Sequence, residues 1–223
     1  MDDPGLRGWA ELHGGIDPSM LVRGWLRGVQ RLAAVPALSR VPPDVLSAAG
    51  VVTAAGAFGA AVAGGRWALL TALLAVLTGV LDGLDGAVAL QTGRARPLGA
   101  VVDAMADRIT DLLLVAVVVA LGGPIAWGLA VAAGVFLHEY LRARAQAAGM
   151  PGPGAVTVAE RPTRIVLVTL AAIGVGLLPG GVPVLGWGWG WVCAVAWTAV
   201  VVVGLVQLTI GVVRTTPGPP ARP

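Results

Sequence analysis

Six long runs of apolar residues, each about as long as a lipid bilayer is thick, constrain this chain more than any other feature. A transmembrane helix needs ~20 mostly apolar residues, and short breaks rich in glycine, proline or arginine separate the runs. The chain is 57% hydrophobic and 12% charged, whereas a soluble domain carries about 25% charged residues. We therefore expect an all-α integral membrane protein with six transmembrane helices, near residues 45–64, 67–91, 98–121, 124–147, 162–180 and 184–213.

The arginines indicate how these helices are oriented. All 15 basic residues are arginine, and the chain has no lysine. If the N-terminus, the second loop, the fourth loop and the C-terminus share one side, only Arg66 lies on the opposite side. Because positive charges accumulate on the cytoplasmic side of a membrane, we expect a multi-pass protein of the cell membrane with both termini in the cytoplasm.

A helix lying on the membrane surface is expected before the first span, at residues 17–36. Asp17 is a suitable N-cap and Pro18 suits the first helical position. A basic amphipathic helix of this kind binds an anionic leaflet. We interpret it as a membrane anchor, and a part in catalysis is the alternative. Its apolar face contains Leu21, Trp25, Val29 and Leu32, and its basic face contains Arg23, Arg27 and Arg31.

These features divide the chain into three parts. Residues 1–44 form a cytoplasmic segment with the surface helix, residues 45–213 form the six-helix domain, and residues 214–223 form a cytoplasmic tail. Cys193, the one cysteine, is expected to be an apolar filler in a spanning helix. No nucleic-acid partner is expected.

Five aspartates lie in or beside the second and third apolar segments, where charge is costly. A charged side chain at the bilayer centre costs ~2.5–3.5 kcal/mol, so such residues usually have a function. Spacings of three and four residues bring side chains to one face of a helix. The first four therefore predict two facing carboxylate pairs, and the fifth is interpreted as orienting Arg108 or another polar group. In chain order they are Asp82, Asp85, Asp103, Asp107 and Asp111.

Carboxylates with no histidine or cysteine nearby suit a hard cation such as Mg²⁺ or Mn²⁺. Four negative charges can hold two such ions and still leave coordination positions for phosphate oxygens. One alternative is that Arg94 and Arg108 neutralise the acids as structural ion pairs. Another is a divalent-cation transporter or channel, which the clustering of the acids near the cytoplasmic end and the absence of a polar path outward disfavour.

The segment DGLDGAVA at 82–89, followed by GAVVDAMAD at 99–107, resembles the signature of the CDP-alcohol phosphotransferases, also called CDP-alcohol phosphatidyltransferases. That signature contains two aspartates, a glycine, Ala-Arg, a spacer of eight or nine residues, a second glycine and two further aspartates. The six-helix layout with cytoplasmic ends matches this family as well. The signature arginine, which helps to hold the nucleotide's phosphates in the family, is replaced by Leu90. We expect Arg94 or Arg96 to supply the missing charge; a degenerate, lipid-binding family member is the alternative.

The resemblance implies an enzyme, usually homodimeric, that transfers a phosphatidyl group from CDP-diacylglycerol to an alcohol and releases CMP. It implies that Asp82, Asp85 and Asp103 are ligands of two divalent metal ions, Mg²⁺ or Mn²⁺, and that Asp107 is both a ligand and the general base. The resemblance also implies a set of donor-binding residues. Close helix packing is the alternative explanation for Gly86, Gly99 and residues 47–50. These donor residues are Ser47, Ala48, Ala49, Gly50, Gly86, Arg94, Arg96 and Gly99.

Arginines flanking the fourth loop favour an acceptor that carries its own phosphate, because arginine suits phosphate recognition. The alternative is that they serve membrane topology and headgroup contacts. This region, with DRITD at 107–111, resembles phosphatidylinositol-phosphate synthases, which use inositol 1-phosphate. Phosphatidylglycerophosphate synthases, which use glycerol 3-phosphate, are the alternative; they more often carry lysine at the position of Arg108. His138 is interpreted as a polar residue near a helix end. The expected acceptor residues are Arg142, Arg144, Arg161 and Arg164.

Overall fold

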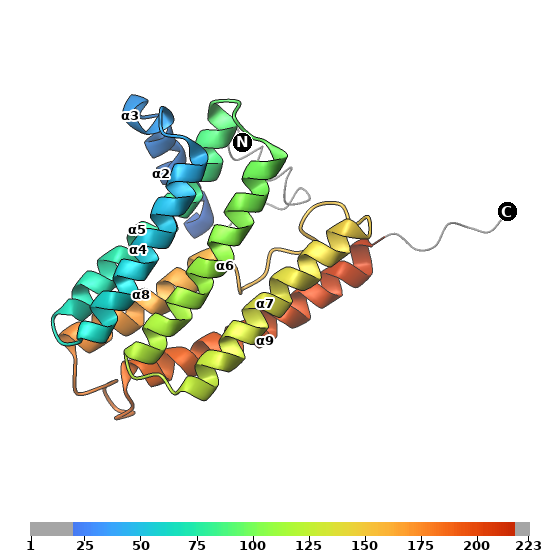
Figure 1. The fold of residues 1–223 in the computed structure, drawn as a ribbon. Coiled ribbons are helices and arrows are strands. Elements are labelled where there is room, and N and C mark those ends of the chain that lie inside the picture. Colours follow the sequence, from blue (N-terminus) through green and yellow to red (C-terminus); the bar gives the residue numbers. More distant parts are fainter. Residues whose placement is uncertain (1–19, 217–223) are drawn as a thin grey trace.

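The structure, a computed structural model, describes residues 20–216, without the side chains of Met20, Leu21, Val22 and Leu26. Within this range the chain forms helices and no strand, so the all-α class is confirmed (Figure 1). In chain order the helices are α2 (Met20–Ala33), α3 (Pro36–Ser39), α4 (Pro43–Ala63), α5 (Trp67–Gln91), α6 (Pro97–Ala120), α7 (Ile125–Ala147), α8 (Arg161–Leu177) and α9 (Trp189–Thr215).

Three of the described helices, α4, α5 and α9, are long and apolar enough to cross a membrane. Helix α8 has 17 residues, whereas ~20 residues are needed to cross a bilayer without local thinning. Helices α6 and α7 have 24 and 23 residues, but both contain several charged side chains. The protein is therefore a helical membrane protein, and the count of six spans remains a prediction.

The helices begin and end close to the predicted positions, except around the last apolar run. Proline occupies the first turn of α4, α6 and α8, where a missing N–H costs no intrahelical hydrogen bond. The run predicted at 184–213 becomes helical only at Trp189. Gly181 and Gly186 have φ of 97° and 67° in the preceding segment, a conformation that ends regular helix and that glycine adopts without a steric penalty.

The long helices form a bundle in which α6 lies between two groups (Figure 1). Helices α4, α5 and α8 pack together on one side, and α7 packs along α9 on the other. The core consists largely of alanine and valine around Trp197, which is almost fully buried. Small residues permit this close approach: a Cβ atom at Gly134 of α7 would collide with Val201 of α9.

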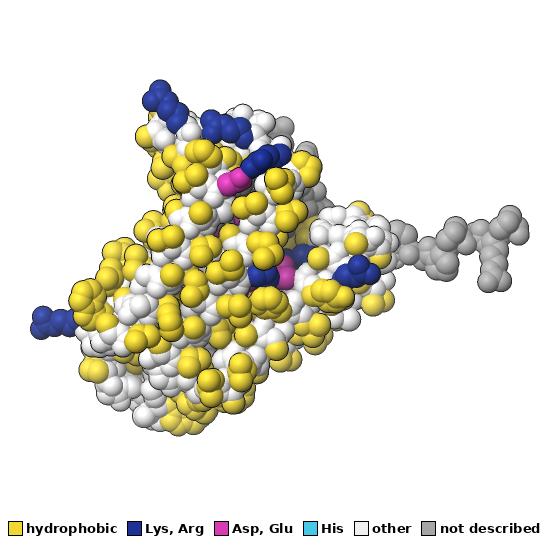
Figure 2. Space-filling model, in the orientation of Figure 1, with side chains coloured by type: hydrophobic (Ala, Val, Ile, Leu, Met, Phe, Trp, Pro, Cys, Tyr) yellow, Lys and Arg dark blue, Asp and Glu magenta, His cyan; other side chains and the backbone are white. Residues whose placement is uncertain are grey.

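The visible surface of the bundle is mostly apolar (Figure 2). Hydrophobic side chains spread over the helical body, and charged side chains are few on this face. Large apolar residues are exposed on several helices, among them Val52, Leu73, Leu129 and Val206. Exposed apolar surface of this extent is unusual in a soluble monomer, and it agrees with helices that face lipid.

Helix α2 lies against α5 rather than apart from the bundle. Val29 and Ala33 are buried together with Leu84 and Val88 of α5, and Gln91 donates a hydrogen bond from Nε2 to the Gln30 carbonyl oxygen (3.2 Å). Part of the expected apolar face therefore packs on protein, and the surface orientation of this helix on a membrane stays a prediction.

The bounds of α2 also differ from the prediction at its C-terminal end. Helix α2 ends at Ala33 rather than at residue 36, and the separate short helix α3 follows it. The predicted start, with Asp17 and Pro18, lies outside the described residues. Arg27 and Arg31 of the expected basic face are exposed.

Candidate metal centre and active site

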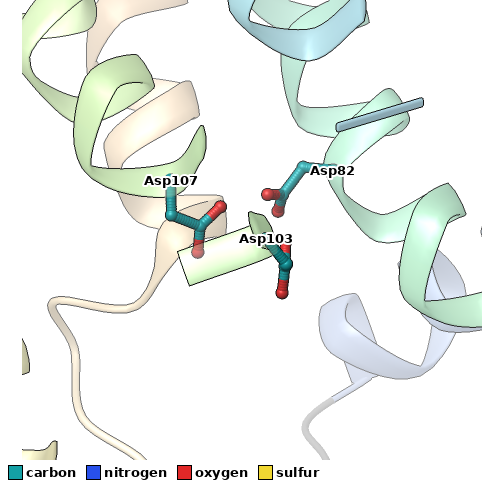
Figure 3. A group of neighbouring side chains, drawn as sticks. All are labelled: Asp82, Asp103 and Asp107. Atoms are coloured by element: carbon teal, nitrogen blue, oxygen red, sulfur yellow. The ribbon is translucent and has the colours of Figure 1, made fainter. Parts of the chain in front are cut away.

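Three aspartates from two helices meet at the contact between α5 and α6. One carboxylate oxygen each of Asp82, Asp103 and Asp107 lies within 4.8 Å of the other two. Figure 3 shows the three carboxylate groups converging on a shared space, Asp82 from one helix and the other two from its neighbour. The four-residue spacing in α6 places Asp103 and Asp107 on the same face, as the sequence predicts.

Asp85 lies beside this trio and is held by two hydrogen bonds. Its carboxylate accepts one from the Ser47 hydroxyl (2.5 Å) and one from the backbone N–H of Gly86 (2.6 Å). A small cavity of about 10 Å³ is lined by Asp85 and by all three members of the trio. Four carboxylates therefore surround one space, although Asp85 is not among the three closest.

A cationic side chain already lies among these carboxylates. The Nε atom of Arg161, at the start of α8, is 3.0 Å from Asp82 Oδ2, and its Nη1 atom pairs with Asp107 Oδ1. Both nitrogens are buried without a well-formed hydrogen bond. One guanidinium leaves most of the negative charge unbalanced, and oxygen-only ligands suit Mg²⁺ or Mn²⁺. The residues present therefore fit a divalent metal.

A larger cavity of about 680 Å³ opens next to the trio, where Asp85 and Asp103 form part of its wall. This volume is typical of a site for a sizeable small molecule. Five of the expected donor-binding residues line it: Ser47, Gly86, Arg94, Arg96 and Gly99.

The remaining three residues of the expected donor set lie elsewhere. Gly50 lines the small cavity. Ala48 and Ala49 line neither cavity, and Ala48 is exposed. Successive residues on a helix point in directions ~100° apart, so Ser47 and Gly50 face the cavities while these two alanines do not, and their part in donor binding stays a prediction.

Leu90, at the place of the signature arginine, forms part of the wall of the large cavity and is 65% exposed. Arg94 donates hydrogen bonds to the carbonyl oxygens of Ser39 (3.0 Å) and Val41 (3.3 Å), so it holds the turn after α3. Arg96 instead pairs with the carboxylate of Asp44. Arg96 already holds an anionic group in the cavity wall, and the same guanidinium geometry suits a phosphate, so Arg96 is the better candidate for the missing charge.

Gly99 makes room for Arg96. A Cβ atom at position 99 would lie 3.2 Å from Cγ of Arg96 and 3.8 Å from an Asp44 carboxylate oxygen. A Cβ atom at this position would require the Arg96 side chain to shift by a few tenths of an ångström. The sequence predicts that Gly99 either allows close packing or serves donor binding. Both explanations refer to its contact with Arg96, which lines the large cavity.

The four expected acceptor arginines do not all lie together: Arg142 and Arg164 share Glu139 as a partner, whereas Arg144 lies apart. Arg164 is 2% exposed and donates hydrogen bonds to Asp111 Oδ2, Glu139 Oε1 and the Ala159 carbonyl oxygen, at 2.8, 2.8 and 2.9 Å. Arg142 pairs with Glu160 at 2.6 Å. Both are engaged by acids of the protein itself.

Arg144 does not join the other three arginines. It is exposed and lies two residues beyond Arg142 on α7, which turns it about 200° around the helix axis. Arg161 contacts the aspartate trio, as described above. Only Arg161 therefore combines a position beside Asp107 with a guanidinium whose partners are the candidate metal ligands.

Apart from Asp111, sequence reasoning did not anticipate the acids that pair with these arginines. Arg108 Nη2 lies 3.1 Å from Asp111 Oδ2 and 3.8 Å from Asp107 Oδ2. The interpretation of Asp111 as the group that orients Arg108 is confirmed, and Asp111 also holds Arg164. The three-residue spacing of Glu139 and Arg142 in α7 was an available signal for part of this network.

Glu160 and His138 anchor the loop before α8. Burial alone would raise the pKa of Glu160, but the hydrogen bond and charge of Arg142 and the Thr157 N–H together hold it below its ordinary value. His138 lies in the middle of α7 rather than near its end, and it is buried with Nε2 3.1 Å from Thr157 Oγ1. The helix-end interpretation of His138 is therefore wrong, because α7 continues to Ala147.

A helical membrane fold with a partly buried carboxylate cluster beside a large cavity suits an enzyme that uses a divalent metal on a sizeable substrate. Residues 40–205 match the family model of the CDP-alcohol phosphatidyltransferases. The chain therefore belongs to this family, which confirms the resemblance found in the motif.

Two curated relatives are similar in sequence. The chain is 36% identical over 194 residues to phosphatidylinositol phosphate synthase of Mycolicibacterium smegmatis, which covers 79% of each chain. It is 33% identical over 107 residues to archaetidylinositol phosphate synthase of Pyrococcus horikoshii, covering 47% of this chain and 56% of that one.

A solved structure is similar in fold. The crystal structure of Mycobacterium tuberculosis phosphatidylinositol phosphate synthase with CDP-DAG bound has a TM-score of 0.66 and 26% identity. The match covers 88% of this chain and 98% of that one. The same protein in complex with manganese and citrate gives a TM-score of 0.67 and 25% identity, covering 87% and 92% of the two chains.

Proposed function

We propose that this protein transfers the phosphatidyl group of CDP-diacylglycerol to a hydroxyl of inositol 1-phosphate and releases CMP. The observation that carries the proposal is the aspartate trio that opens onto a cavity of about 680 Å³. The related phosphatidylinositol phosphate synthases, one of them with CDP-DAG bound, support this choice of donor and acceptor.

Asp82, Asp85, Asp103 and Asp107 are the residues that would hold the metal, and we propose two ions of Mg²⁺ or Mn²⁺. When bound, divalent ions supply positive charge that offsets the charge of the pyrophosphate. The manganese in a structural relative supports this assignment. Ser47 would keep the Asp85 carboxylate oriented through the hydrogen bond between their side chains.

Asp107 would act as the general base. The acceptor oxygen forms a bond to the β-phosphorus of the donor, the bond from that phosphorus to the bridging oxygen breaks, and CMP leaves. Asp107 takes the hydroxyl proton as the new bond forms. Arg161 at one carboxylate oxygen and Arg108 near the other, at 3.8 Å, keep this side chain in position.

The donor would bind with its nucleotide in the large cavity. Arg96 would exchange its ion pair with Asp44 for a phosphate oxygen, and so replace the charge lost at Leu90. Gly86 would let the phosphates approach the backbone of α5, because a Cβ there meets nothing within 4 Å.

The acceptor phosphate would bind beside Asp107, with Arg161 as the principal arginine. Arg142 and Arg164 would shape this side of the site while they remain paired with Glu160 and Asp111. A phosphorylated acceptor suits arginine donors because the guanidinium fork matches two phosphate oxygens.

The proposed setting is the cell membrane, with residues 1–44 and 214–223 on the cytoplasmic side and residues 45–213 as the six-span domain. The arginine distribution supports this orientation. A homodimer is part of the proposal because the resembling family forms homodimers, and the exposed apolar residues of the helical body provide surface for it.

The decisive experiment measures CMP release by the purified protein with CDP-diacylglycerol and Mg²⁺. The acceptor panel contains inositol 1-phosphate, glycerol 3-phosphate, inositol and glycerol. We expect release with inositol 1-phosphate and little with inositol. CMP release only with glycerol 3-phosphate would show that glycerol 3-phosphate is the acceptor. No CMP release, together with divalent-metal flux into liposomes, would overturn the proposal that the protein is an enzyme.

A further inference from the structure

Glu139 of α7 lies at the centre of three arginines from three helices. Its Oε1 atom accepts a hydrogen bond from Arg164 Nη2 (2.8 Å) and lies 4.0 Å from Arg108 Nη1. Its Oε2 atom is 3.6 Å from Arg142 Nη1. The three arginines come from α8, α6 and α7, so this one carboxylate connects all three helices beside the proposed base.

The other acids of this network are placed differently. Asp111 is 1% exposed and lies deep between Arg108 and Arg164. Glu160 belongs to the loop before α8 and pairs with Arg142 alone among the described arginines. Glu139, with a side chain that is 24% exposed, is thus the carboxylate that both reaches open space and touches every arginine of the group.

Two donors around Glu139 lack an acceptor. Arg108 Nη1, the nitrogen that faces Glu139 at 4.0 Å, is buried with no hydrogen-bond partner, and so is Arg142 Nε. Buried donors are nearly always satisfied in folded proteins. Unsatisfied donors on two arginines that flank one partly exposed carboxylate point to an acceptor oxygen from a ligand.

The charge of the network is balanced only because Glu139 is present. Arg108, Arg142 and Arg164 carry three positive charges, and the acids nearest to them, Asp111, Glu139 and Glu160, carry three negative charges, with Asp107 counted in the metal cluster. Without Glu139 the network would gain one positive charge a few ångströms from the unsatisfied donors. A phosphate monoester carries about −1.5 to −2 charges at pH 7, so this balance bears directly on how strongly the site holds a phosphorylated alcohol.

We propose that Glu139 is the residue that sets the charge of the acceptor site. It holds the three arginines together and limits the affinity of the site for phosphate, which the lipid product also carries. This inference rests on the proposed function and deepens it. Glu139 acts on the acceptor through the arginines, so it is a positioning residue rather than a catalytic one.

The test measures binding of inositol 1-phosphate, inorganic phosphate and unphosphorylated inositol by calorimetry, with the full chain and without donor. Glu139→Gln keeps the shape and removes the charge. We expect it to bind both phosphate compounds about tenfold more tightly, because one repulsive charge is removed at short range, and to bind inositol unchanged. Glu139→Asp, which keeps the charge, is expected to remain within about twofold of the unaltered chain.

Arg66→Gln is the control for a change of net charge, because Arg66 is exposed and precedes the first residue of α5, about 24 Å along that helix from Asp82. It is expected to leave the binding of inositol 1-phosphate unchanged. Equal or weaker phosphate binding by a folded Glu139→Gln variant would overturn the proposal. If Glu139→Gln does not fold, Arg108→Gln decides instead: about tenfold weaker phosphate binding is expected, and unchanged binding would overturn it.

These binding measurements separate the inference from the proposed reaction. A chain that releases no CMP with any acceptor, yet binds phosphate more tightly after Glu139→Gln, would refute the reaction and keep the charge-setting role. A chain that releases CMP with inositol 1-phosphate but shows no response to Glu139→Gln would keep the reaction and refute the role of Glu139.

Discussion

The aspartate cluster between α5 and α6 and the arginine network around α7 and α8 are both groups of charged side chains that are largely withdrawn from solvent, but their charges are balanced differently. Four aspartates and only one arginine line the small cavity. In the neighbouring network, three arginines face three acids. The excess negative charge of the aspartate cluster can be offset by a bound cation. The arginine network has no such excess, and its ion pairs mainly hold helices together. The two groups meet at Asp107, which Arg108 and Arg161 both approach.

The largest effect is expected at the unbalanced cluster. Asp107→Asn should reduce CMP release by about 10³-fold or more, because it removes the proposed base and a metal ligand together. Mn²⁺ binding measured by electron paramagnetic resonance should weaken in the same variant. Arg66→Gln serves as the control, because it removes an exposed charge at the opposite end of α5 from Asp82. Activity close to that of the unaltered chain in Asp107→Asn would show that Asp107 is not the base.

The next largest effect is expected in the arginine network around α7 and α8, and it is an effect on the stability of the fold. Arg164→Ala leaves the buried Asp111 and the partly exposed Glu139 without their closest partner, and breaking a buried ion pair costs ~3–5 kcal/mol. Thermal unfolding in detergent should show a large fall in Tm. A Tm within a degree or two of the unaltered chain would mean that the network does not hold the helices together, and the contrast between the two groups would fail.

A smaller effect, in the opposite direction, is expected at the wall of the large cavity. Leu90→Arg restores the signature arginine at a position that is 65% exposed, and the added charge should lower the KM for CDP-diacylglycerol several-fold. Leu90→Met is the neutral control of similar volume. If Arg96 already supplies the charge, Arg96→Ala should raise this KM. Adding Leu90→Arg to Arg96→Ala should then lower the KM most of the way back to that of the unaltered chain. An unchanged KM in all three variants would separate both residues from donor binding.

The smallest effect is expected at Arg144, the one arginine of the expected acceptor group that lies apart. Because its side chain is exposed, Arg144→Ala should change the acceptor KM by less than about twofold. Its free energy of unfolding, followed through Tm, should change by less than ~0.5 kcal/mol. A loss of acceptor affinity as large as that of Arg161→Ala would return Arg144 to the acceptor site.

Local periodicity made much of this protein predictable. The helix bounds followed from apolar run length and from prolines and glycines, because these act through the backbone of their own segment. The spacing of Asp103 and Asp107 placed them on one face for the same reason. The exceptions were also local: Trp189 begins the last helix later than hydropathy alone suggested, since hydropathy does not report the turns of the preceding glycines.

By itself, the sequence determined the helical membrane fold, the family motif and the identity of the acids that a metal would need. Only the tertiary structure decided which charges face each other. Arg164 and Asp111 are 53 residues apart and become partners because α6 and α8 pack together. Arg142 and Arg144 are two residues apart and separate because a helix turns them away from each other. Charge pairing depends on distances between side chains of different helices, and those distances are set by packing that no single segment encodes.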